Sequence, residues 1–187
     1  FILATTGNLN LTAGGASVPV TTDGEGKVVI GVQKIRDGLA AGVKGQMNAA
    51  FRRSAFIEVN RSLPLNMLVT FDLPEMKPNC DRRRSTTVVT QSLWFLNDDQ
   101  IIQLTNHLAD RLFAEFPEQQ SDRLHSLFLR LFATKPTIKE HRFVSEFLAH
   151  QEGFFKADQN PEWQKKLKAQ PEAAGKQALA ALAQVLM

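Results

Sequence analysis

Residues 97–132, NDDQIIQLTNHLADRLFAEFPEQQSDRLHSLFLRLF, contain the pattern that decides the fold class. Apolar side chains recur at helical spacing in the first half, at Ile101, Leu104, Leu108 and Leu112. A second stripe follows, made of Leu124, Leu127, Phe128, Leu131 and Phe132. An apolar stripe on one side of a helix must be buried against another apolar surface. The stretch therefore predicts two helices, with N-caps at Asn97 and Ser121, that pack as neighbours.

More helices are expected on both sides of this stretch. Upstream, residues 62–71 (SLPLNMLVTF) and residues 87–96 have helical patterns. Downstream, TIKE at residues 137–140 has the spacing of a capping box. NPEW (residues 160–163) and QPEA (residues 170–173) each place a proline where a helix would begin. The chain is therefore predicted to be mainly α.

The beginning of the chain has a different character. Residues 1–26 are rich in glycine, threonine, serine and asparagine, which is typical of irregular backbone. Residues 26–35 and 54–60 are short β-rich runs, expected to pair antiparallel across a long connection. We expect one domain of 187 residues, with a loop-rich segment and a small antiparallel β-hairpin in residues 1–60. An irregular helical bundle is expected over residues 61–187.

Composition narrows the classes of function. The net charge is +3, and the positive excess lies mid-chain, at Arg52, Arg53, Arg61 and Arg82 to Arg84. Nucleic-acid binding usually needs a longer basic stripe, so this function is not favoured. No apolar run reaches the roughly 20 residues that span a bilayer, so membrane insertion is not expected. The chain begins at Phe1 and ends at Met187 inside a helical pattern, which we interpret as a piece of a longer protein.

The segment NCDRRRST, residues 79–86, contains the only cysteine and three consecutive arginines. Nearby arginines would lower the pKa of the Cys80 thiol, as a nucleophile requires, and they could also hold a small anion. The favoured interpretation is structural, because acidic neighbours such as Asp72 can pair with the arginines. The candidate structural or anion-binding residues are Asp72, Cys80, Arg82, Arg83, Arg84, Arg52 and Arg53.

Metal, haem and hydrolase motifs are not found. The histidines at positions 107, 125, 141 and 150 lack the spacing of a helical zinc site. The sequence has no C-x-x-C-H haem motif and no G-x-S-x-G nucleophile turn. No metal and no cofactor are therefore expected in this chain.

The central block, residues 51–98, resembles the signature of a planctomycete-specific domain of unknown function. Its motifs fall on Arg52, Arg53 and Ser54; Arg61, Ser62 and Pro64; Phe71, Asp72 and Pro74; Cys80, Arg82 and Arg83; Thr86 and Thr87; and Gln91, Leu93, Leu96 and Asn97. Residues 4–18 are similar to the family's Gly-Gly segment, with Ala16 where proline is usual. Residues 127–148 and 179–187 are similar to its later helices, with Lys135 in place of arginine.

This resemblance implies an exported protein, periplasmic or in the cell envelope, in which the domain often follows a cytochrome-c-like domain. Haem would then belong to an upstream domain of the parent protein. Partners would be other domains of the same polypeptide, and a small anion is a further candidate. The family brings no known catalytic residues.

Three hypotheses follow. The leading one is a non-catalytic structural or interaction module, in which Asp72 pairs with an arginine of the Arg82 to Arg84 run. The second is part of an enzyme for an anionic substrate, such as an acidic sugar, with Cys80 and these arginines lining the site. The third is a disulfide between Cys80 and a cysteine outside this chain.

Overall fold

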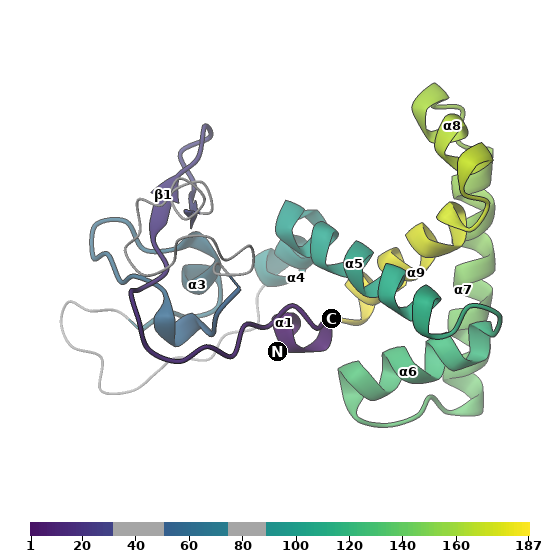
Figure 1. Cartoon of the computed structure of the whole chain (residues 1–187), viewed down its shortest axis with the longest axis horizontal. Helices are drawn as coiled ribbons and strands as arrows, with labels where there is room; N and C mark the ends of the chain where they lie inside the picture. The colour runs from purple at the N-terminus through teal and green to yellow at the C-terminus, as the bar shows by residue number, and fades with distance from the viewer. Residues whose placement is uncertain (32–50, 75–88) are drawn as a thin grey trace. The chain divides into compact units, whose positions relative to one another are not determined.

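The computed structural model describes residues 1–31, 51–74 and 89–187 (Figure 1). The chain divides into two compact units. Residues 1–7 and 94–187 form what we call the helical unit, and residues 8–93 form the hairpin unit. The predicted fold class is confirmed, because the described residues are mainly helical and contain a two-stranded antiparallel hairpin near the N-terminus.

The helical unit is built from α-helices joined by short connections. They are α1 (Ile2–Thr5), the end of α4 (Val89–Asn97), α5 (Asp99–Glu115), α6 (Gln120–Phe132), α7 (Ile138–Ala157), α8 (Pro161–Ala169) and α9 (Ala173–Leu186). Helix α9 packs against both α5 and α7, and α5 also packs against α6 (Figure 1). In the parts of the chain that the structure describes, no helix combines the length and apolar character that a bilayer crossing needs.

The core of the helical unit consists of the predicted stripes and of alanines from α9. Its buried members include Leu108, Leu112, Leu124, Leu127, Leu131, Val144, Leu148, Ala178, Leu179 and Leu182. The small alanine side chains let α9 lie close to its neighbours. Phe132, which the sequence pattern placed on the apolar stripe, is instead 47% exposed. Phe132 is the last residue of α6, and at this end of the helix the apolar stripe is no longer covered by the core.

Two of the predicted helix starts are confirmed. Thr137 and Glu140 form the expected capping box at the start of α7. Both the backbone N–H and the hydroxyl of Thr137 donate to the Glu140 carboxylate, and these bonds lower its pKa from the ordinary value. Pro161 lies in the first turn of α8, as predicted, and Asn160 caps that helix through bonds from the N–H groups of Glu162 and Trp163.

Three predicted starts are wrong by one or two residues. Asp98, not Asn97, caps α5, because its carboxylate accepts the backbone N–H of Gln100 at 3.0 Å while Asn97 still belongs to α4. The N-cap of α6 is Gln119, so Ser121 already lies inside the helix. The N-cap of α9 is Glu172, so Pro171 precedes the helix.

The hairpin consists of β1 (Val20–Thr22) and β2 (Val28–Ile30), with Val20 opposite Ile30. Asp23 organises the turn by accepting the backbone N–H groups of Glu25 and Lys27. The predicted strand over residues 26–35 is therefore present in part, but the predicted partner is wrong. Strand β2 pairs with β1, which is close to it in sequence, because a short loop costs less entropy to close than a long one.

The other predicted strand, residues 54–60, is not a hairpin strand. Residues Ser54–Phe56 form a 3₁₀ turn, η1, and the backbone then runs parallel to the N-terminal loop. Val18 is fixed on both sides, since its N–H donates to the Phe56 carbonyl at 2.7 Å and its carbonyl accepts the Glu58 N–H at 2.8 Å. Helix α3 (Asn66–Thr70) also belongs to this unit and is shorter than predicted. The unit has its own core of Val18, Val20, Val28, Ile57 and Leu65.

The first seven residues return to the helical unit. Arg111 on α5 donates to the Thr6 carbonyl at 3.1 Å. Gly7 lies against the Arg111 guanidinium and has φ +74°, in the left-handed region that favours glycine. Glu115 forms ion pairs with both Arg111 and Arg130. The hairpin unit is thus inserted in sequence between α1 and the remaining helices.

The core can be tested with two matched substitutions. Leu108→Ala removes a side chain that is 0% exposed, and it should cost about 2–5 kcal/mol of unfolding free energy through the cavity it leaves. Leu129→Ala makes the same change at a residue of α6 that is 47% exposed, and it should cost less than about 1 kcal/mol. Urea unfolding measures both, and equal losses would contradict this assignment of the core.

Candidate functional site

Arg52 lies in the hairpin unit, and its residue surface is only 5% exposed. Its guanidinium donates to three backbone carbonyls of the N-terminal loop. Nε reaches Thr12 at 3.3 Å, Nη1 reaches Ala16 at 2.8 Å, and Nη2 reaches Gly14 at 2.5 Å. The backbone beside it is held as well, because the Asn10 N–H donates to the Phe51 carbonyl at 2.9 Å. Residues 10–18 therefore wrap around one buried cation.

The wrapping depends on two consecutive glycines. Gly14 and Gly15 have φ values of +78° and +79°, in the left-handed region that other residues rarely adopt. A Cβ at either position would meet nothing within 4 Å. Backbone conformation, not lack of space, is therefore the reason that this loop uses glycine. The bend that these two residues make possible carries the carbonyls of residues 12, 14 and 16 to a single guanidinium.

In the described part of the chain, the charge of Arg52 is balanced by carbonyl dipoles and an aromatic ring. The guanidinium carbon lies 4.1 Å from the centroid of the Phe56 ring, over its face. Among the residues that the structure describes, no carboxylate forms an ion pair with Arg52. Three carbonyl dipoles and one aromatic face thus stabilise the cation, in keeping with the geometry that guanidinium groups favour. This cation is therefore engaged by backbone carbonyls of its own chain.

The other predicted site residues within the described regions are Arg53 and Asp72. Arg53 is exposed and is the N-cap of η1, where its carbonyl accepts the Phe56 N–H. Asp72 follows α3 with φ +58°, a conformation that aspartate tolerates better than most residues. Cys80 and Arg82, Arg83 and Arg84 lie outside the described residues, so the predicted pairing with Asp72 stays a prediction.

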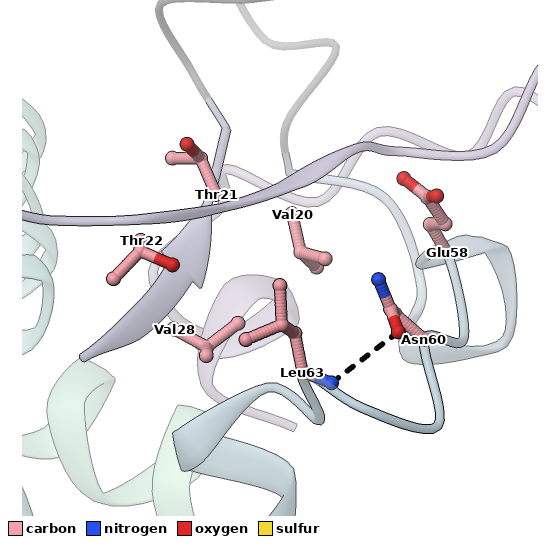
Figure 2. Close-up of a pocket in the computed structure, with 7 residues that line it drawn as sticks. All are labelled: Val20, Thr21, Thr22, Val28, Glu58, Asn60 and Leu63. Atoms are coloured by element: carbon pink, nitrogen blue, oxygen red, sulfur yellow. Dashed lines mark hydrogen bonds between the residues drawn. The ribbon is translucent and has the colours of Figure 1, made fainter. Parts of the chain in front are cut away.

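Figure 2 shows a pocket of about 290 Å³ beside the hairpin. Its lining residues are Val20, Thr21, Thr22, Val28, Glu58, Asn60 and Leu63. The lining combines aliphatic side chains with two hydroxyls, one amide and one carboxylate. All seven residues belong to the hairpin unit. This pocket was not predicted from the sequence, because it forms where β1 and β2 meet residues 58–63, and the strand pairing was predicted wrongly.

The histidines of the helical unit do not form a metal site. The His125 and His141 rings lie with their centroids 5.8 Å apart, and His141 Nε2 is 3.3 Å from the Ser121 hydroxyl. In the described ranges, no group of three or more histidine, cysteine or acidic residues could hold a metal ion. Ser121 and His141 share an exposed hydrogen bond, and among the described residues no acid is hydrogen-bonded to the His141 ring.

A charged cluster around Phe113 joins the helices. Arg123 lies over the Phe113 ring at 4.1 Å and donates to the Phe116 and Pro117 carbonyls, which closes the turn between α5 and α6. Burial lowers the pKa of Arg123, and nearby carboxylates partly oppose this. Lys176 on α9 pairs with Glu172, whose hydrogen bond raises the pKa of Lys176, and also with Asp110. These bonds hold helices together.

The family model PSD1, described as "Protein of unknown function (DUF1553)", matches residues 1–148. The chain belongs to this family. No curated protein and no solved structure shows significant similarity to it. The match covers the hairpin unit and the helical unit as far as α7, so the tail of the chain, residues 149–187, lies beyond it.

The structure gives a physical reason for two motifs in this PSD1 chain. The Gly-Gly segment, at Gly14 and Gly15, and the Arg-Arg-Ser segment, at residues 52–54, are about 38 residues apart in sequence. In the fold they bind each other, because Arg52 takes up the carbonyls that the glycine turn presents. Both segments are recognisable in the sequence, but their contact is not, since no local pattern indicates which arginine is buried.

Proposed function

We propose that this chain is a non-catalytic structural and interaction module of a larger, exported protein that is associated with a cytochrome-c-like domain. The observation that carries the proposal is the buried Arg52, which was a candidate for anion binding. Its Nε, Nη1 and Nη2 atoms each donate to a backbone carbonyl of the N-terminal loop, so Arg52 ties that loop to the segment around residue 52. The expected location, periplasmic or in the cell envelope, rests on the resemblance of the sequence to the planctomycete domain.

PSD1 is a family of unknown function, so membership in it assigns no activity to this chain. The enzymatic alternative depends on Cys80 and the Arg82 to Arg84 run. These residues lie outside the described part of the chain, so the alternative remains a prediction from the sequence. Of the described candidates, Arg52 acts within the fold and Arg53 is exposed on the surface.

Arg52→Lys tests the structural role, with Arg53→Lys as a matched control at the adjacent exposed position. Lysine keeps the charge but loses the planar fork that reaches three carbonyls, so Arg52→Lys should cost about 2–4 kcal/mol. Arg53→Lys should leave the melting temperature almost unchanged. Sulfate should not raise the melting temperature of the wild-type protein. An unchanged melt for Arg52→Lys, or stabilisation by sulfate that this variant alone abolishes, would favour an anion site.

The interaction role is tested on the intact parent protein. We expect it to purify from the cell envelope, with haem in another domain, and with crosslinks from lysines of this chain to that domain. Lys139 and Lys156 at the two ends of α7 are suitable reporters. Purification from the cytosol, or crosslinks confined to this chain, would contradict the proposal. The haem content of the parent protein is read independently from its absorption spectrum.

A further inference from the structure

The pocket beside the hairpin has an unusual arrangement of polar groups. Figure 2 shows Glu58 and Asn60 at one end, Thr21 and Thr22 at the other, and Val20 and Leu63 between them. Val20 and Val28 are buried members of the hairpin-unit core. The pocket floor is therefore part of a packed core and the polar groups stand around its rim.

The Asn60 amide is fixed in one orientation. Its Oδ1 accepts the backbone N–H of Ser62 at 3.0 Å and that of Leu63 at 3.3 Å. These two bonds place the oxygen toward the turn and leave the nitrogen, Nδ2, on the side of the pocket (Figure 2). Asn60 therefore presents a donor to whatever occupies the pocket, and its orientation is set before binding.

Glu58 presents a hydrogen-bond acceptor, whereas Asn60 presents a donor. Its backbone is held by the bond from its N–H to the Val18 carbonyl, while its side chain is exposed. No cation of the described residues pairs with it, and among those residues it is the only charged one in the lining. An ionised carboxylate is acceptor-only, so one end of the pocket places an acceptor near a donor.

We propose that this pocket binds a neutral polyhydroxylated ligand, such as a pyranose sugar. Each hydroxyl both donates and accepts, so two adjacent hydroxyls satisfy Glu58 and Asn60 together. The Thr22 hydroxyl supplies a further partner, and the aliphatic floor takes the C–H face of the ring. The volume of about 290 Å³ suits one sugar unit.

Other ligand classes fit less well. An organic anion would accept from Asn60 but would be repelled by the Glu58 carboxylate. An alkyl cation would pair with Glu58 and leave the Asn60 donor without a partner. A trans peptide group carries its N–H and its C=O on opposite sides, so it does not address two groups at the same end of the pocket.

The test compares three sugars that share a pyranose ring and differ in charge: one neutral, one anionic and one cationic. Methyl glucopyranoside, glucuronate and glucosamine are each titrated into the ¹⁵N-labelled protein, and cyclohexanol serves as the ring without the additional hydroxyls. We expect saturable shifts of the amide signals of residues 20–22, 28 and 58–63 with methyl glucopyranoside. Glucuronate, glucosamine and cyclohexanol should bind more weakly. Equal affinity for any of these three, or no saturable shift with the neutral sugar, would overturn the proposal.

Two variants locate the site. Asn60→Asp keeps the oxygen that accepts the Ser62 and Leu63 N–H groups, so the turn persists, but it replaces the donor by a second acceptor. It should weaken binding of methyl glucopyranoside about 3- to 10-fold. Glu58→Ala should have a similar effect, while Glu118→Ala, an exposed carboxylate in the helical unit, should have none. Unchanged affinity in both pocket variants, with their spectra showing a folded protein, would contradict the assignment.

Discussion

A buried guanidinium is the constraint on which the hairpin unit depends. Taking a charge out of water costs several kcal/mol unless its donors are satisfied, so a nearly buried arginine forces the chain around it to supply acceptors. Here the acceptors are the carbonyls of Thr12, Gly14 and Ala16, with the Phe56 ring against the cation. An N-terminal loop with little regular structure thereby acquires a defined path.

The same constraint positions the rest of this unit. Once residues 10–18 are tied to the segment around Arg52, Val18 and Ile57 are brought together by their backbone bonds, and both enter the small core. The hairpin extends from that core, and residues 58–63 pass beside it. The pocket is a consequence of this arrangement. The helical unit, by contrast, has a continuous apolar core from α5, α6, α7 and α9, to which Arg123 and Lys176 add bonds between the helices.

Much of the helical unit could be predicted from the sequence, because its stripes repeat with the period of an α-helix and its caps have local signatures. Leu108, Leu124 and the Thr137 capping box are examples. The hairpin partner was predicted wrongly because β propensity does not specify pairing, and Ser54–Phe56 forms a 3₁₀ turn instead. Arg52 was included among the candidate residues, but nothing local distinguishes it from Arg53, and only the tertiary fold buries one of them.

The most direct test of this account is the exchange of the side-chain N–H protons of Arg52, observed by ¹⁵N NMR. Protons donated to buried carbonyls exchange slowly with water, because the bond must open before exchange occurs. We therefore expect resolved, slowly exchanging Nε and Nη signals for Arg52, and fast exchange for the exposed Arg53 in the same spectrum. Equally fast exchange for both arginines would contradict the claim that Arg52 holds the N-terminal loop.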